Sequence, residues 1–347
     1  MNRVFASIVA SAALLGLAAC ADSVTEVAAP VDLQPSFSQY PELNDSHGHI
    51  MKVKSEGKKD VEQSEKDLAF AKSNSKPGAG TGIYYHGGPV LQSATKVVAI
   101  YWAPSQPIYN GGPSAAGSGA GTSDGSLVGY FLRNLGGSSY YAINATYTDG
   151  SGTAIRNVVN YTGYWANTTN GPVDGQNVSD AAMVAMLQSG FNSGAITYDP
   201  STLYSIFTAG KANLGGGFGT QYCAYHTHGT VTIGGVSRTV LYAAMPYDQA
   251  YPGVCTEGTA SPNNDAGADS EVNTLAHEIE ETTTDMMGNA WFDRRGYENA
   301  DKCAWTWGTT YTASNGGVWN ITIGSKNFLV QRNWVNAGSG GCYKSWP

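Results

Sequence analysis

The sequence has little positive charge. Among its 347 residues, Lys and Arg together number 19 against 27 Asp and Glu, and the formal net charge is -8. Binding to a nucleic-acid backbone needs clustered Lys and Arg, so we expect no nucleic-acid partner. The two glycine-rich segments, 111–125 and 214–219, lack the lysine and the strand-turn-helix context of a phosphate-binding loop, and we expect both to be loops.

Long apolar runs are scarce. The clearest one lies at the amino terminus, from Val4 to Ala19, and is too short for a convincing membrane-spanning helix. Residues 1–19 resemble a bacterial lipoprotein signal, which implies that Cys20 becomes the lipidated first residue after cleavage; an ordinary secretory signal cut nearby is the alternative. Both interpretations predict an exported protein. It is membrane-anchored only through a lipid on Cys20 in the first case, and secreted in the second.

Cysteine is also scarce, and none of the five cysteines forms a C-x-x-C pair. The absence of such pairs argues against a structural zinc site. Setting Cys20 aside leaves four cysteines, an even number that favours disulfides in an exported protein. Three pairings are possible. We favour Cys223 with Cys255 and Cys303 with Cys342, because each pair closes a loop of modest length.

Composition divides the rest of the chain into two parts. Residues 20–80 are dense in Lys, Glu, Asp and Ser, a composition that cannot bury enough apolar surface to fold alone. We interpret them as a disordered tether or pro-segment with a short helix from Lys58 to Lys72, and we expect His47 and His49 to be solvated. Residues 81–347 are poor in charge and rich in Gly, aromatic residues, Asn, Ser and Thr, which is typical of an exported β-rich domain.

Strands and helices are expected to alternate within this domain. Apolar runs predict strands at residues 96–102, 155–164, 203–208, 222–226 and 239–245. Amphipathic patterns predict helices at residues 126–135 and 180–189, and a third in the segment before Gly288. Strands that precede an active-site helix are typical of zincin-type domains. We therefore predict an α+β fold, a single exported domain with a zincin-like arrangement.

The third helix carries the most informative motif, within the segment LAHEIEETTTD from Leu275 to Asp285. On a helix, His277 and Glu281 project from one face, so an imidazole nitrogen and a carboxylate oxygen can meet at one cation. Glu278 stands beside them, where a zinc hydrolase with an H-E-x-x-H motif places its general base. Glu281 replaces the second histidine, and carboxylates are competent ligands, so we expect Zn²⁺ as the cofactor. The alternative is a solvated acidic helix with a chance histidine.

Flanking residues suggest where this helix begins and ends. Asp269 and Ser270 are candidate N-caps, and Gly288 is a candidate stop. The apolar positions fall on the side away from the motif, so we expect the polar face to look into a cleft or into solvent. The apolar stripe consists of Val272, Leu275, Ala276, Ile279 and Met286.

A zinc site needs a third protein ligand from a later segment. Glu298 is our preferred candidate, and Asp301 is the alternate ligand or a partner that orients one; both could instead be surface acids. His226 and His228 point to one face of a predicted strand. If that face lines the cleft, His226 is a ligand or a donor to a developing oxyanion, and otherwise it is a structural histidine.

Seven short motifs follow one another along the chain. They are YHGGPVL at 85–91, CAYHT at 223–227, PNNDAGAD at 262–269, HEIEE at 277–281, NAW at 289–291, ENADKC at 298–303 and NFLVQ at 327–331. In this order they resemble the EXORDIUM or phosphate-induced protein family of plants and its microbial relatives, over about residues 81–347. The resemblance implies a secreted or wall-associated protein. It also implies that His277, Glu278, Glu281, Glu298 and Asp301 belong to one site.

Two functions from different classes follow. The first is an exported zinc-dependent hydrolase, in which Glu278 activates water for attack on a peptide or cell-wall substrate. Among hydrolases we favour a peptidase. The second is a non-catalytic secreted protein that binds cell-wall carbohydrate or a peptide and keeps the same residues as a structural metal site or a hydrogen-bond node. An open coordination position beside Glu278 would favour the first, and closure by four protein ligands the second.

Overall fold

The computed structural model describes residues 49–59, 62, 82–215, 217–257 and 261–347. The predicted signal, Cys20, His47 and most of the predicted helix at 58–72 lie outside these ranges. Residues 54–59 are helical, so helix begins before the predicted position. His49 lies in a strand, which differs from the tether predicted for this part of the chain.

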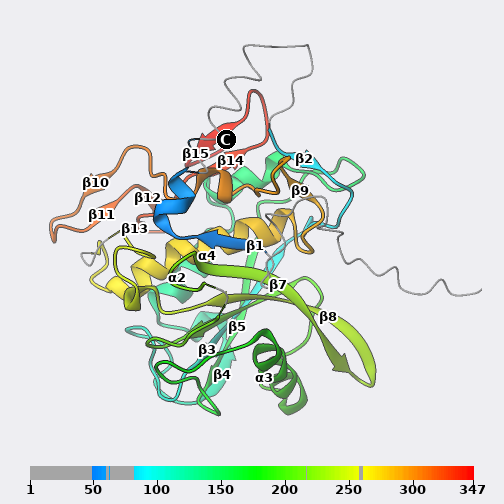
Figure 1. The fold of residues 1–347 in the computed structure, drawn as a ribbon, viewed down its shortest axis with the longest axis vertical. Coiled ribbons are helices and arrows are strands. Elements are labelled where there is room, and N and C mark those ends of the chain that lie inside the picture. Colours follow the sequence, from blue (N-terminus) through cyan, green and yellow to red (C-terminus); the bar gives the residue numbers. More distant parts are fainter. Residues whose placement is uncertain (1–48, 60–61, 63–81, 216, 258–260) are drawn as a thin grey trace, which may run out of the picture. The chain divides into compact units, whose positions relative to one another are not determined.

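A seven-stranded mixed sheet forms the centre of the described domain (Figure 1). Its order from edge to edge is β1 (His49–Lys52), β7 (Tyr222–Ile233), β8 (Val236–Met245), β6 (Thr202–Thr208), β3 (Thr95–Trp102), β5 (Val159–Asn167) and β4 (Gly117–Ala120). The four strands from β8 to β5 are parallel, whereas β1, β7 and β4 run antiparallel to their neighbours. All five predicted strands are present. The prediction of a loop at 111–125 is wrong in part, because β4 pairs there with β5.

Helices cover both faces of this sheet. Because side chains alternate along a strand, Val97, Ala99 and Tyr101 of β3 face one core, and Val98 and Ile100 face another. The first core contains helices α2 (Leu127–Leu135) and α4 (Ala266–Thr284), and the second contains α3 (Asp180–Ser193). The predicted mixture of helices and strands is confirmed, with a large central sheet and few helices.

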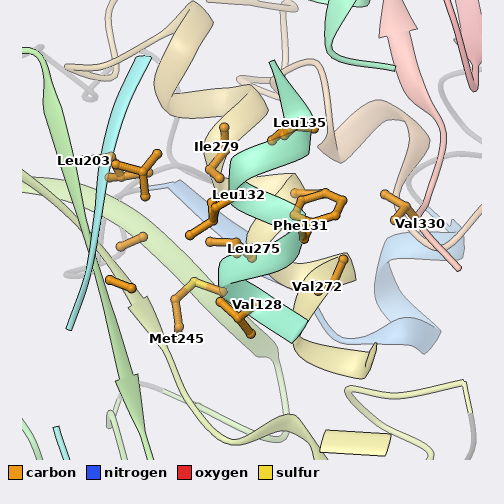
Figure 2. Close-up of a cluster of buried hydrophobic side chains, with 14 of the residues drawn as sticks. Val128, Phe131, Leu132, Leu135, Leu203, Met245, Val272, Leu275, Ile279 and Val330 are labelled. Carbon is orange, nitrogen blue, oxygen red and sulfur yellow. The ribbon is translucent and has the colours of Figure 1, made fainter. Parts of the chain in front are cut away.

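The first core fixes α4, the helix that carries the HEIEE motif (Figure 2). Leu275 and Ile279 of α4 are fully buried there, together with Phe131 and Leu132 of α2. Truncation of such a side chain to alanine typically costs ~2–5 kcal/mol of unfolding free energy. The apolar stripe of α4 is therefore held firmly, and this fixes where its polar residues lie.

The limits and surroundings of α4 differ from the prediction. The helix begins earlier, with Asp265 as N-cap accepting from the Ala268 amide at 3.2 Å, and it ends at Thr284, before Gly288. Every residue from Glu271 to Asp285 is buried, so the expectation of a polar face in a cleft or solvent is wrong. Three successive threonines satisfy their hydroxyls within the helix, each donating to the carbonyl four residues earlier.

The carboxy-terminal third supplies the segments that cover the polar face of α4. Its strands form short two-stranded sheets: β10 (Tyr311–Thr312) with β11 (Val318–Trp319), β12 (Ile321–Ile323) with β13 (Lys326–Phe328), and β14 (Asn333–Val335) with β15 (Gly341–Tyr343). Its first strand, β9 (Trp291–Phe292), pairs with β2 (Tyr84–Tyr85) from a much earlier part of the chain. The Asn333 side chain donates to the Glu280 carboxylate at 2.7 Å, and the backbone amide of Gln331 donates to the side-chain oxygen of Asn273 at 2.8 Å. These contacts provide partners for polar side chains that a single amphipathic stripe would leave in solvent.

Two disulfides stabilise the described chain. They join Cys223 to Cys255 and Cys303 to Cys342, as we favoured from the sequence. Disulfides of this kind are consistent with an extracellular protein. None of the helices in the described ranges is long and apolar enough to cross a membrane.

Candidate metal centre

Six residues that the sequence singled out come together beside α4. His277, Glu278 and Glu281 lie on α4, and His226 lies on β7, the strand next to the sheet edge. Glu298 and Asp301 arrive on the loop that leads into the short 3-10 helix Asp301–Cys303. Five of the six side chains are buried, and Asp301 keeps 12% of its side chain exposed.

The first group of possible ligands is His277, Glu281 and Asp301. His277 Nε2 lies 3.0 Å from Glu281 Oε1 and 3.6 Å from Asp301 Oδ1. The backbone amide of Asp301 donates to the same Glu281 oxygen at 3.0 Å, which fixes the carboxylate against the loop. The ligand atoms of this group therefore converge on one point.

The second group is His226, Glu278 and Glu281. His226 Nδ1 lies 3.2 Å from Glu278 Oε2 and 3.6 Å from Glu281 Oε2. Its other ring nitrogen, Nε2, lies 3.7 Å from Glu298 Oε2. Glu281 thus takes part in both groups, with one oxygen directed to each histidine.

The spacing and the chemistry of these atoms fit a divalent cation. Two ligands bound to tetrahedral zinc at ~2.0–2.1 Å lie about 3.3 Å apart, within the 3.0–3.7 Å range of the contacts above. Imidazole and carboxylate donors suit Zn²⁺ and similar metals. Four carboxylates gathered beside two histidines also carry an excess of negative charge, and buried charge is costly unless it is compensated. The neighbouring Lys302 binds Asp293 instead, at 2.9 Å.

The crowding of negative charge also shifts the pKa values of His277 and Glu298. Burial alone would lower the pKa of His277, but the charge of Glu281 and hydrogen bonds to Asp301 and Glu281 raise it well above its usual value. Burial raises the pKa of Glu298 well above its usual value, and the charges of Glu281 and Asp285 raise it further. A cation at the centre would reverse this preference for protonated forms.

The loop that carries Glu298 and Asp301 is held in place by its neighbours. The Asn299 side chain donates to the Glu280 carbonyl at 3.2 Å, and Gln331 donates to the Ala300 carbonyl at 3.0 Å. The disulfide Cys303–Cys342 ties the following 3-10 helix to β15. These contacts, together with the Glu298 backbone amide donating to the Asp301 carboxylate at 3.3 Å, position both acids against α4.

Two details refine what the sequence suggested. The sequence favoured Glu298 as the third ligand beside His277 and Glu281, whereas the structure places Asp301 in that group and Glu298 beside His226. The buried residue Trp305, two positions after the 3-10 helix Asp301–Cys303, has a φ of 57°, a conformation that is rare for a bulky residue. No local pattern in the sequence signals that conformation.

The sequence matches a known protein family across this region. Residues 136–330, more than half of the chain, match the phosphate-induced protein 1 conserved region. The chain belongs to the phosphate-induced protein 1 family. This confirms the predicted resemblance, and the matched region contains all six residues of the candidate metal centre.

A plant relative supports the assignment to the phosphate-induced protein 1 family. The chain is 29% identical over 160 residues to Protein EXORDIUM-like 3 of Arabidopsis thaliana, covering 39% of this chain and 47% of the plant protein. The aligned part thus spans about half of the length of that relative. No solved structure matches the chain.

Proposed function

We propose that this protein is an exported, zinc-dependent hydrolase that cleaves peptide bonds, with a lipid anchor on Cys20. The observation that carries the proposal is the meeting of a ligand group, His277, Glu281 and Asp301, with the adjacent pair Glu278 and His226. The position of His277 and Glu281 on a helix that packs against strand β7 of a mixed sheet supports the proposal of a zincin-like hydrolase.

Each residue has a distinct role in the proposal. His277, Glu281 and Asp301 hold the cation. When bound, the cation supplies Lewis acidity, which polarises a carbonyl and lowers the pKa of a water molecule. Glu278 accepts the proton of the attacking water and passes it to the leaving amine.

His226 positions Glu278 in this scheme. As a general base Glu278 must be ionised, and an ionised carboxylate can only accept hydrogen bonds. In this scheme the 3.2 Å contact therefore places the proton on His226 Nδ1. The donated bond fixes the orientation of the Glu278 carboxylate. Glu298 Oε2 lies 3.7 Å from Nε2, on the other side of the imidazole.

Burial of the cluster favours a second candidate function. His226, His277, Glu278 and Glu281 are each at most 2% exposed, which suits a structural metal site in a secreted protein that binds cell-wall carbohydrate or a peptide. The two functions differ in whether zinc-loaded protein cleaves a substrate.

Metal analysis and hydrolysis of unstructured polypeptide test the first function together. We expect about one zinc per chain, loss of cleavage with a chelator, and recovery on adding zinc. His277→Ala should abolish metal binding. His86→Ala is the matched control, because His86 is an exposed histidine that stacks on Phe292, outside the cluster.

Two results would count against this scheme. Equal zinc content in the wild type and His277→Ala would refute the ligand assignment. If zinc-loaded protein cleaves no peptide, ester or glycan, the second function, a non-catalytic binding protein, describes the molecule better.

A further inference from the structure

A segment from the amino-terminal side of the domain covers the sheet edge beside the metal centre. β1 pairs antiparallel with β7, with the backbone of residue 49 opposite His226 and Ile50 opposite Tyr225. β1 also packs against α4 (Figure 1). In the described sheet β7 would be the edge strand without β1, and its main-chain groups beside His226 would be open to another strand.

The contacts of β1 combine main-chain pairing with one buried side chain. Met51 is fully buried against Trp305 and the disulfide Cys223–Cys255. The Lys52 carbonyl accepts a hydrogen bond from Trp305 Nε1 at 2.8 Å. The receiving surface is therefore a strand edge with an apolar pocket at one end.

Lys52 adds a second, polar contact. Its Nζ lies 3.3 Å from the Tyr297 hydroxyl and 4.6 Å from the centre of the same ring. Tyr297 directly precedes Glu298 in the sequence, so Lys52 contacts the segment that carries one of the clustered acids. A strand that binds here would be selected for an apolar residue followed by a basic one.

The surface that binds β1 lies within the family's conserved region, whereas β1 itself lies outside it. β7, α4, Tyr297 and Trp305 lie within the matched region 136–330, whereas β1 precedes it. Main-chain pairing to an edge strand accepts many sequences, and pockets for particular side chains give the selectivity. Trp305, held at a φ of 57°, is the pocket residue that contacts β1. Strained residues of this kind cluster at sites that clamp ligands.

We propose that the edge of β7 and the Met51 pocket form a binding site for an extended polypeptide, which β1 occupies in the intact chain as a tethered competitor. The binding site stands on geometry alone. Its assignment as the substrate site rests on the proposed function. The preferred strand has a long apolar residue two positions after the one opposite His226 and a basic residue next to it.

A peptide supplied in trans tests this binding site. The probe is a fluorescein-labelled peptide with the sequence of residues 46–56, SHGHIMKVKSE, added to the full chain. A tethered strand competes at ~mM effective concentration, so the wild type should bind the probe weakly. Met51→Asp places a charge in the apolar pocket and releases β1, and this variant should bind the probe at least tenfold more tightly.

Two controls make the result specific. Ser55→Asp adds the same charge at an exposed position four residues further on, and it should behave like the wild type. A second chain carries a site-specific protease sequence in place of residues 70–75 and is cut after folding. The cut chain keeps its native β1 and should exchange it for the probe, which separates strand release from misfolding of Met51→Asp.

The outcomes separate the binding site from the proposed hydrolase. The binding site is overturned if neither the cut chain nor Met51→Asp binds the probe. It is also overturned if the wild type binds the probe as tightly as these two chains do. Probe binding as expected without cleavage of polypeptide by any chain supports the binding site and refutes the hydrolase. Cleavage by the wild type that neither cutting nor Met51→Asp increases supports the hydrolase and overturns β1 as its competitor.

Discussion

Glu278→Gln gives the sharpest test of the chemistry at the metal centre. The substitution preserves shape and volume but removes the proton acceptor, 3.2 Å from His226 Nδ1 in a fully buried site. If Glu278 is the general base and His277, Glu281 and Asp301 hold the metal, zinc content should stay at about one per chain. The rate of peptide cleavage should fall by ~10²–10⁴-fold, the usual contribution of general acid-base catalysis. That loss corresponds to about 3–5 kcal/mol of activation free energy.

The assay needs a matched buried glutamate, which α4 provides. Glu280→Gln makes the same chemical change two residues along the helix. Burial raises the pKa of Glu280 well above its usual value, although hydrogen bonds from Asn144 and Asn333 lower it. Glu280 belongs to neither group of possible ligands, so the same substitution there should leave the metal centre intact. Its zinc content and cleavage rate should stay within about twofold of the wild type. Loss of zinc from Glu278→Gln but not from Glu280→Gln would make Glu278 a ligand and refute its role as the base.

Three further predictions address metal, disulfide and proton. Glu281→Gln should lose both zinc and activity, because an amide oxygen is the poorer ligand, and full zinc content by elemental analysis would contradict this. Replacing Cys303 and Cys342 by alanine opens a loop with a sequence separation of 39 and should lower the unfolding free energy by ~4 kcal/mol in a urea titration; a loss below ~1 kcal/mol would count against the estimate. Burial raises the pKa values of Asp248 and Glu271 well above their usual range, and the charge of Asp248 raises the pKa of Glu271 further. The two protonated carboxyl groups therefore contribute to the stability of the fold below roughly pH 4, and this contribution is lost as the pH rises through the folded-state pKa values. Glu271→Gln should make Tm fall less steeply with rising pH, and an unchanged slope would contradict this prediction.

The sequence determined which residues could carry the chemistry. Helical spacing alone put His277 and Glu281 on one face, because residues four apart on a helix lie one above the other. Alternation and apolar runs located the five predicted strands that the sheet contains. The even number of cysteines after Cys20 predicted two disulfides, and loop length favoured the pairing that the structure has.

Other features depend on contacts between distant segments, and only the tertiary structure decided them. The polar face of α4 is buried because β14 and its flanking residues bring Gln331 and Asn333 against it, more than fifty residues away in sequence. The placement of Asp301 beside His277 and of Glu298 beside His226 depends on how one loop is anchored, which local spacing does not specify. The pairing of β1 with β7 is equally invisible in a charged segment that lacks the composition of a strand. Local periodicity encodes which side chains share a face, and long-range packing decides what covers that face.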